Sequence, residues 1–253
     1  MQGELSKEMQ QHTYAIMNRV EDSHWWYVGR RLILESFLER IIENSKYKIQ
    51  NPKILDVGCG TGGNLEMLQK FGAAEGVDVS DEALEFCQSK GLTVHKGLAE
   101  ALPFADESFD VVTALDVVEH LDDDAAGLKE MRRVLKTGGK SLIFVPAFMF
   151  LWGVQDDVSN HRIRYTKKQI VERLQLAGFE VERATYANIT FFAPILAGRT
   201  IMKLTGIKPE SENNVNISAL NGVLGKFFGA ERFWLKNLNF PFGVSIVIVA
   251  RKK

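Results

Sequence analysis

Residues 54–63 of this chain read Ile-Leu-Asp-Val-Gly-Cys-Gly-Thr-Gly-Gly, and this stretch decides the fold. It begins with apolar, partly β-branched residues, as a buried strand does, and its glycines allow a turn with positive backbone φ angles. Leu65 and Leu68 then begin a helical spacing. A glycine turn lets the backbone approach a ligand closely, and the helix start offers unpaired N–H groups. We therefore predict that a cofactor binds at this strand, turn and helix.

Two kinds of cofactor fit the glycine pattern. Gly58-x-Gly60-x-x-Gly63 matches the dinucleotide fingerprint, and Asp78 follows about twenty residues later, where an acidic residue binds a ribose diol. Asp56, however, lies two residues before the first glycine. A carboxylate at that place would repel a pyrophosphate but would hold a cationic amine. The charge of Asp56 therefore favours a cofactor with an amino group over NAD.

Several motifs extend this pattern in a fixed order. Asp56-x-Gly58-x-Gly60-x-Gly62 resembles the first motif of the class I S-adenosylmethionine (SAM) methyltransferases, and residues 76–80 (Gly-Val-Asp-Val-Ser) resemble their second. Further similarities to the family are its adenine-side loop at 97–104, its fourth strand at 109–115 and its helix and turn before the fifth strand at 130–139. The chain is thus identified as a member of this family, in the methyltransferase type 11-like branch of bacterial small-molecule, lipid and polysaccharide enzymes.

The resemblance implies a set of SAM-binding residues. The glycine turn would contact the methionine part and the sugar, Asp56 the amino group, and Asp78 both ribose hydroxyls. The family often has an aspartate where this chain has Leu98, so a backbone group or Glu100 would replace its contact with the adenine amino group. The full set is Arg30, Asp56, Gly58, Cys59, Gly60, Gly62, Asp78, Val79, Leu98, Ala99, Glu100 and Leu115. The product would be S-adenosylhomocysteine (SAH).

The N-terminal arm carries the run His-Trp-Trp-Tyr-Val-Gly-Arg-Arg at residues 24–31. Aromatic pairs beside arginines suit a lid over a charged ligand, and Arg30 or Arg31 would pair with the SAM carboxylate. The alternative is that Trp25 and Trp26 pack an N-terminal helix onto the sheet while the arginines are solvated. The resemblance of this run to the segment before the first motif in a bacterial branch of the family favours the lid.

Composition excludes some classes of function. The formal net charge of −1 provides no long-range attraction for nucleic acid, and the end of the fourth predicted strand lacks the Pro-Pro-aromatic and Pro-Cys signatures of base methyltransferases. The two cysteines, Cys59 and Cys87, have no metal-site spacing, so we expect no metal. The polar N-terminus shows no signal peptide, and we expect a cytoplasmic protein.

Strands and helices alternate along the chain, which predicts an α/β fold with right-handed crossovers. Strands are predicted near 53–57, 74–78, 92–95, 109–115, 140–146, 179–188 and 244–250, and helices near 29–43, 63–71, 81–90, 122–136 and 167–177. We expect a Rossmann-like, doubly wound, mostly parallel seven-stranded sheet with helices on both faces. About fifty residues separate the last two strands, too many for a hairpin loop. A single domain would comprise a lid at 1–50, a SAM-binding core at 51–188, a substrate-cap insertion at 189–240 and the last strand at 241–253.

Methyl transfer from a sulfonium needs alignment and, for a hydroxyl acceptor, removal of a proton. The candidate bases are His120, after the fourth strand, and His161, in the loop 156–166. The alternative is that His120 caps a strand or helix end and that Asp157 orders His161 in its loop. The apolar stretch in the insertion is about ten residues long, too short to span a bilayer. It would form a cap over an apolar acceptor, a peripheral membrane contact at 189–207, or a cover for the sheet edge.

The sequence therefore predicts a SAM-dependent methyltransferase, with O-methylation of a small, lipid-like or saccharide acceptor as the preferred reaction. One alternative is an NAD-dependent oxidoreductase, against which Asp56 argues. Another is a catalytically silent SAM-fold partner protein, against which the retained motif residues argue. We expect no nucleic-acid partner.

Overall fold

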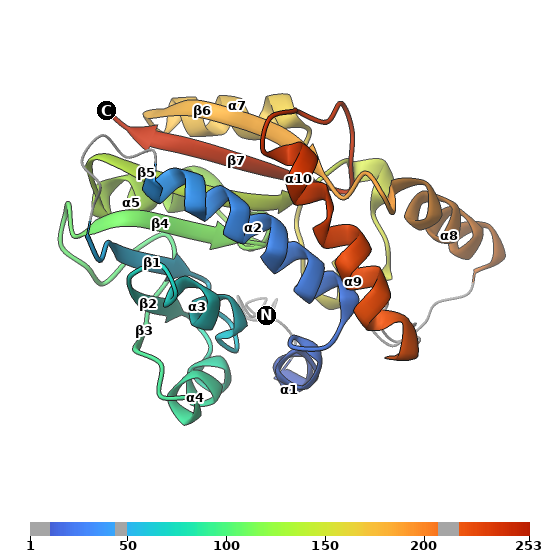
Figure 1. Ribbon diagram of the computed structural model, residues 1–253. Helices are drawn as coiled ribbons and strands as arrows, with labels where there is room; N and C mark the ends of the chain where they lie inside the picture. Colours follow the sequence, from blue (N-terminus) through green and yellow to red (C-terminus); the bar gives the residue numbers. More distant parts are fainter. Residues whose placement is uncertain (1–10, 44–49, 207–217) are drawn as a thin grey trace, which may run out of the picture.

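Seven strands form one sheet in the order β3-β2-β1-β4-β5-β7-β6, with helices on both faces (Figure 1). The computed structural model describes residues 11–43, 50–206 and 218–253. The strands are β1 (Lys53–Val57), β2 (Ala73–Asp78), β3 (Val94–Lys96), β4 (Phe109–Leu115), β5 (Leu135–Pro146), β6 (Phe179–Ala187) and β7 (Ser245–Lys252). β1 to β5 are parallel, and β7 is antiparallel to both β5 and β6. The predicted Rossmann-like sheet is confirmed.

The helices are α1 (Gln11–Val20), α2 (Trp25–Glu43), α3 (Gly63–Leu68), α4 (Asp81–Ser89), α5 (Asp124–Val134), α6 (Val154–Val158), α7 (Lys167–Leu176), α8 (Phe192–Thr205), α9 (Asn221–Gly229) and α10 (Glu231–Leu235). Short 3₁₀ helices are η1 (Val118–His120), η2 (Met149–Leu151) and η4 (Ser218–Leu220). Within the described ranges, every helix is too short or too polar to traverse a lipid bilayer.

The core lies on the two faces of the sheet, and strand alternation divides it. Along β7, Ile246 and Ile248 belong to the cluster that α5 and α7 cover. Val247 and Val249 point the other way, into the cluster formed with α2, α9 and α10. Successive side chains of a strand point to opposite faces. The apolar run of β7 is therefore continuous because both faces are buried.

Most observed elements begin and end within three residues of their predicted bounds, and the starts of α2, β3 and β5 are informative differences. α2 begins at Trp25 instead of residue 29, because the Trp25 N–H donates to Asn221 Oδ1 at 3.3 Å and so finds a partner across the fold. β3 begins at Val94, because the N–H of Leu92 still bonds to the Cys87 carbonyl at the end of α4. β5 begins at Leu135, directly after α5. These contacts connect residues distant in sequence or continue a helix end.

The N-terminal arm and the insertion meet over one face of the sheet, where α9 packs against α2 (Figure 1). A Cβ at Gly29 would lie 2.5 Å from the ring of Phe228, so glycine is needed for this close crossing. β6 and β7 pair in antiparallel orientation although α8, α9 and α10 lie between them in sequence. The predicted ranges 1–50 and 189–240 extend over 1–10, 44–49 and 207–217, which lie outside the described residues.

Candidate functional site

A cavity of about 370 Å³ lies at the carboxyl ends of β1, β2 and β4. Ligands of open α/β sheets bind at this edge. Gly58, Asp78 and Leu115 line the cavity from the strand ends. Met17 of α1 and Ile195 of α8 line it too, so the N-terminal arm and the insertion both contribute to its wall.

Most residues of the predicted site line this cavity. Those of the cofactor set are Arg30, Gly58, Cys59, Gly60, Asp78, Val79, Leu98, Ala99, Glu100 and Leu115. Both predicted catalytic histidines, His120 and His161, line it as well. Asp56 and Gly62 are absent from the lining, and each has a structural reason.

The glycine turn is shaped by Gly58 and Gly60, whose φ angles are 67° and 53°. A Cβ at Gly58 would lie 2.5 Å from Val117 Cγ2, so a side chain has no room there. The Gly60 N–H donates to Asp78 Oδ2 at 2.8 Å. The turn between β1 and α3 is thus held against the end of β2, with its backbone exposed to the cavity.

Gly62 serves the packing of the turn. Its φ of 94° requires glycine, and a Cβ would lie 2.5 Å from Leu92 Cδ1 and 3.1 Å from Cys87 Sγ. These neighbours belong to the small core under α4. Gly62 is thus needed for the close approach to α4, and its contact with the cofactor stays a prediction.

Asp56 is buried under the turn instead of facing the cavity. Thr113 Oγ1 donates to Asp56 Oδ1 at 2.6 Å, and Oδ2 has no hydrogen-bond partner among the described residues. Burial raises the pKa of Asp56 to about 7, against the opposing effects of the Thr113 hydrogen bond and the Arg30 charge. The structure does not bring this carboxylate to the cavity wall, where the sequence placed it beside the amino group of SAM.

The raised pKa of Asp56 has a consequence for stability. Between its ordinary value of 3.8 and about 7, the folded chain retains a proton that the unfolded chain has lost. The contribution of Asp56 to the free energy of unfolding should therefore fall as pH rises through this range, by at most about 1.4 kcal/mol per pH unit. Asp56→Asn keeps an acceptor for Thr113 and should lack this component. Urea denaturation at pH 5 and pH 8 measures how the free energy of unfolding changes with pH, with exposed Asp106→Asn as the control. An equal change in the unaltered chain and both variants would contradict the prediction.

Asp78 is fixed by two backbone donors at the end of β2. Its Oδ2 accepts from the Gly60 N–H and its Oδ1 accepts from the Ser80 N–H at 3.0 Å. A carboxylate has capacity for further donors on each oxygen. Ser80 in turn caps α4 by accepting from the Ala83 N–H. The orientation of the side chain is thereby fixed at the cavity wall, and the ribose contact of Asp78 stays a prediction.

The loop after β3 forms the neighbouring wall. The Gly97 N–H donates to the Asp78 carbonyl at 3.0 Å, and a bridge between Leu98 and Ala101 closes the turn that follows. Leu98, Ala99 and Glu100 line the cavity, and Leu98 stands where the family often has an aspartate. Glu100 and the loop backbone are therefore the polar groups available on this side.

Helix α1 is joined to the glycine turn by Glu21, a residue that no sequence motif singled out. Its buried carboxylate accepts from Thr61 Oγ1 at 2.9 Å and pairs with Lys90 Nζ at 2.8 Å. A Cβ at Gly63 would lie 2.5 Å from Glu21 Oε2, and one at Gly60 would lie 2.8 Å from Met17 Cε. The arm thus lies closed over the turn, in the position that a lid would take.

The tryptophans of the arm pack against other aromatic side chains and also reach the cavity. Trp26 stacks on Phe228 with ring centroids 5.5 Å apart, and it meets Phe144 of β5 edge-on at 6.2 Å. Trp25 contacts Phe191 at 4.6 Å. Both tryptophans are half-buried and line the cavity while they pack α2 onto the sheet.

Arg30 and Arg31 both have protein partners. The Arg30 guanidinium forms an ion pair with Asp116 and donates to Asn64 Oδ1 at 2.9 Å. Asp116 has a φ of 61°, which non-glycine residues seldom adopt, and the ion pair helps to hold it. Arg31 donates to the Glu21 carbonyl at 2.5 Å. A SAM carboxylate would share Arg30 with Asp116, so the role of Arg30 stays a prediction.

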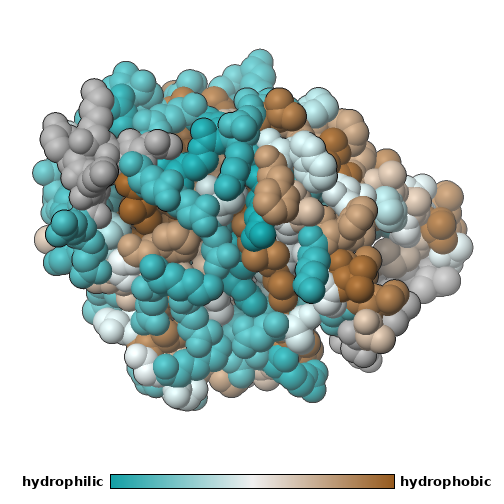
Figure 2. Space-filling view, in the orientation of Figure 1, coloured by the Kyte–Doolittle hydropathy of each residue, from teal (hydrophilic) through white to brown (hydrophobic). Residues whose placement is uncertain are grey.

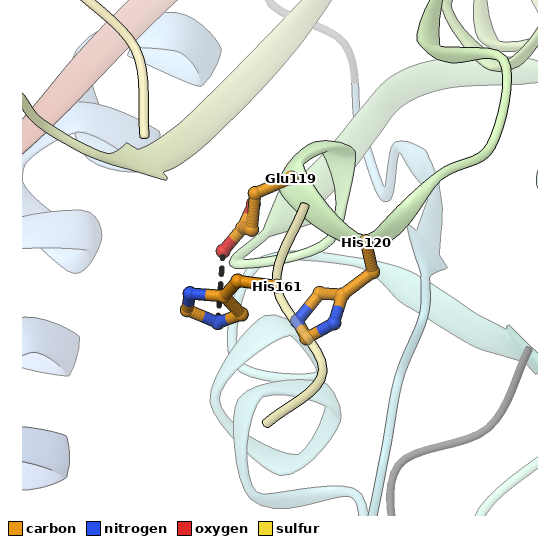
Figure 3. A group of neighbouring side chains, drawn as sticks. All are labelled: Glu119, His120 and His161. Carbon is orange, nitrogen blue, oxygen red and sulfur yellow. Dashed lines mark ion pairs between the residues drawn. The ribbon is translucent and has the colours of Figure 1, made fainter. Parts of the chain in front are cut away.

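Beside the end of β4, Glu119 and His120 of η1 meet His161 (Figure 3). Their possible ligand atoms all lie within 4.8 Å of one another. The Glu119 carboxylate points at the ring of His161, and His161 Nε2 is 3.9 Å from Glu119 Oε1. The rings of His120 and His161 meet edge to face with centroids 4.6 Å apart. Burial lowers the pKa of His120 to about 3, with a smaller effect from His161, so His120 alone is a poor proton acceptor at neutral pH.

Asp156, instead of the expected Asp157, orders His161. Asp156 Oδ1 lies 2.8 Å from His161 Nδ1, whereas Asp157 accepts from Trp152 Nε1. Asp156 also pairs with Arg164 at 2.7 Å and with Arg199 of α8 at 3.3 Å. Burial alone would raise the pKa of Asp156, but the His161 hydrogen bond and the two arginines hold it well below its usual range. This buried cluster joins the loop 153–164 to the insertion.

Comparisons with known proteins agree with this geometry. The family model described as "Methyltransferase domain" matches residues 55–143, the segment from β1 to β5 with the glycine turn and Asp78. Demethylmenaquinone methyltransferase of Chlorobaculum parvum is 36% identical over 142 residues, which are 53% of this chain and 55% of that protein. The chain therefore spans about half of the length of this curated relative.

Two solved structures match nearly the whole chain. A SAM-dependent methyltransferase from Thermotoga maritima has a TM-score of 0.56 at 22% identity and covers 96% of this chain and 100% of its own. Phosphoethanolamine N-methyltransferase 2 of Haemonchus contortus, in complex with SAM, has a TM-score of 0.56 at 18% identity. The match covers 99% of this chain and 60% of that protein chain. At these identities the likeness shows a shared fold.

Proposed function

We propose that the chain is a class I SAM-dependent methyltransferase, the family that it resembles over residues 55–143, and that it methylates a hydroxyl oxygen of a small or lipid-like acceptor. The observation that carries the proposal is one cavity lined at one end by the glycine turn and Asp78, and at another by His120 and His161. The match of the glycine turn to a methyltransferase model also argues against the alternative of an NAD-dependent oxidoreductase.

The residues of the cavity fit SAM. Gly58 and Gly60 line the cavity with backbone and no side chain, and Asp78 offers a fixed carboxylate to a ribose diol. Val79, Leu98 and Ala99 provide apolar surface for an adenine ring. SAM supplies a methyl group that its sulfonium has already activated. The protein therefore has to align the acceptor and to remove its proton.

The group around His161 supports a binding place for the methyl acceptor at that end of the cavity, the acceptor end. The Asp156 carboxylate fixes the ring through Nδ1, which leaves Nε2 as the basic atom toward Glu119. Arg164 and Arg199 line the same part of the cavity and hold Asp156 as a carboxylate. A hydroxyl placed here would lie beside two histidines and would be deprotonated as the methyl group is transferred.

The deciding experiment is calorimetric titration with SAH, with NAD as the parallel control, followed by an assay of methyl transfer from SAM to hydroxylated aromatic and lipid acceptors. We expect binding of SAH alone. His161→Ala should then lower turnover while the affinity for SAH stays unchanged, because His161 lies at the acceptor end. Binding of neither ligand would favour a silent SAM-fold partner protein, and equal losses of turnover and SAH affinity would give His161 a structural role.

A lipid-like acceptor is favoured by the surface of the insertion. Brown residues gather over α8, α9 and α10 in Figure 2, while the side with α3 and α4 is mostly teal. The exposed apolar side chains of these helices are Ile201, Leu204, Val223, Phe227, Phe233 and Trp234. Lys226 and Lys236 are exposed among them. Apolar and cationic side chains on one face suit peripheral contact with an anionic membrane. The similar C. parvum protein is also named for a lipid quinone.

Vesicle cosedimentation tests this contact. We expect the protein to sediment with phosphatidylglycerol-containing vesicles and less with pure phosphatidylcholine. Phe227→Ser combined with Trp234→Ser should reduce the bound fraction several-fold, since buried apolar area drives such binding. Leu176→Ser removes a leucine at the end of α7 that is more exposed than Phe227 or Trp234, and it is the control. A soluble fraction that is the same with and without vesicles would contradict the membrane contact.

The free, buried thiols of Cys59 and Cys87 favour a reducing compartment, which we propose is the cytoplasm.

A further inference from the structure

Glu119 is a buried acid whose carboxylate lacks a hydrogen-bond partner among the described residues, with His161 Nε2 at 3.9 Å as its nearest ionic neighbour. The residue is 0% exposed, and neither Oε1 nor Oε2 forms a hydrogen bond with any described residue. A buried polar group without a partner is costly, and such groups are rarely left unsatisfied in folded proteins. The carboxylate points at the ring of His161 (Figure 3). The surroundings of Glu119 therefore call for a cation or a proton between these groups.

His161 has the orientation of a metal ligand. Its Nδ1 is held by Asp156 at 2.8 Å, and its Nε2 faces Glu119 Oε1 at 3.9 Å. Metal-ligating histidines almost always donate their second ring N–H to a carboxylate or carbonyl, which fixes the tautomer and raises the basicity of the ligating nitrogen. Asp156 is 1% exposed and is itself held by two arginines. The supporting contacts of a metal site are thus in place.

We propose that Glu119, His120 and His161 bind a divalent transition-metal ion, with zinc as the best-suited ion. Two imidazoles and one carboxylate are the donor set of catalytic zinc sites, which keep one position open. Ligand atoms at about 2.0–2.2 Å from a tetrahedral ion lie roughly 3.3 Å apart. The 3.9 Å gap would close by about half an ångström, and a pair at the upper limit of 4.8 Å by about 1.5 Å. Side-chain rotation suffices for such a movement.

The sequence gives no sign of this site, because forty residues separate His161 from the adjacent pair Glu119 and His120. The fold unites them where η1 follows β4 and the loop after α6 crosses it. The Arg162 N–H donates to the Glu119 carbonyl at 2.9 Å, which fixes the register of the two segments. The expectation that the chain binds no metal is therefore replaced by a site made from two distant segments.

The ion would explain how an acceptor is activated, and this part rests on the proposed function. His120 and His161 line the cavity, so the open position of the ion faces the acceptor. With an ion bound, His161 Nε2 would act as a ligand in place of its role as a base. The metal would lower the pKa of a coordinated hydroxyl, which would lose its proton to water. The resulting oxygen forms the new bond to the methyl carbon, while the carbon–sulfur bond breaks and its electron pair stays on sulfur. The acceptor class is then a phenol, a catechol-like diol or another hydroxyl that can coordinate an ion.

The test is metal binding by the whole chain, measured without any acceptor. Protein freed of metal with a chelator is titrated with Zn²⁺ by calorimetry and with Co²⁺ by visible absorption. We expect one ion per chain and a Co²⁺ spectrum without the charge-transfer band of a cobalt–thiolate bond, which excludes Cys59 and Cys87 as ligands. Asp156→Asn should weaken binding by about 10–100-fold as a supporting residue. Glu119→Gln and His161→Ala should weaken it by more.

His95→Ala is the matched control, because His95 is a half-exposed histidine paired with Glu75 outside the cavity. Its metal affinity should equal that of the unaltered chain. SAH titration of every variant shows whether the cofactor end is intact, so loss of metal with retained SAH binding supports the site. The proposal is overturned if the unaltered chain binds no ion saturably, or if Glu119→Gln binds it as tightly as the unaltered chain. Failure to bind SAH with metal binding retained would instead contradict the proposed function.

Discussion

Replacing Asp78 with alanine should weaken SAH binding by at least 100-fold. Each hydrogen bond from a ribose hydroxyl to this carboxylate would contribute about 1.5–3 kcal/mol, because the acceptor is charged and nearly buried. Two such bonds amount to a factor of 100 or more, since about 1.4 kcal/mol corresponds to tenfold in affinity. Calorimetric titration with SAH measures the change directly.

Asp78 also holds the backbone N–H groups of Gly60 and Ser80, so the alanine variant should lose stability as well. Asp78→Asn keeps one acceptor oxygen and tests the charge separately, with a smaller loss of stability expected. Glu75→Ala on the same strand removes an acid that pairs with His95 outside the cavity, and its SAH affinity should stay unchanged. SAH affinity that is unaltered in a folded Asp78→Ala variant would contradict the assignment of the ribose site.

The parts of this molecule that sequence predicts well are those whose cause is local. The glycine turn is one example, because Gly58 requires a positive φ and a position without Cβ whatever surrounds it. Asp78 is another, since the residue at the end of β2 is next to β1 in any sheet of this type. The seven strands follow from short apolar runs and the order of crossovers. These features confirm the fold and bring most of the predicted cofactor residues to one cavity.

The parts that sequence misses depend on contacts between distant segments. Glu21 docks the arm through Thr61 and Lys90, but nothing in the neighbouring sequence marks it. Asp56 and Gly62 occur in the glycine motif, yet Thr113 and the core under α4 surround them. A motif gives the spacing of residues along the chain. It does not say which of them face the ligand and which face the sheet.

The acceptor end shows the same limit most clearly. Sequence singled out His120 and His161 separately, each as a base, with ordering by Asp157 as the alternative for His161. The structure pairs His161 with Asp156, the residue before Asp157. The short helix α6 turns Asp156 inward and leaves Asp157 bonded to Trp152. One helical step separates a buried residue from an exposed one, and periodicity over a helix of five residues is too short to decide between them.

The contrast between these neighbouring acids leads to the second large effect. Asp156→Ala should lower the free energy of unfolding by about 3–5 kcal/mol, the cost of removing one partner from a buried ion pair. The variant leaves Arg164 and Arg199 buried without their carboxylate, and it also removes the acceptor for the Gly153 N–H at the start of α6. The pKa of Asp156 is lowered in the fold, so this contribution is complete at pH 7 and is lost only as pH falls below its ordinary value of 3.8.

Urea denaturation at pH 7 measures the effect, and Asp157→Ala is the matched control. That variant loses one exposed hydrogen bond from Trp152 Nε1 and should cost about 1 kcal/mol or less. Asp156→Asn, which keeps the shape of the side chain, should fall between the two and extends the comparison if the alanine variant does not fold. Equal stabilities for Asp156→Ala and Asp157→Ala would mean that water or a rearranged carboxylate satisfies the two arginines. In that case the cluster would not fix His161, and the orientation of the acceptor end would have another cause.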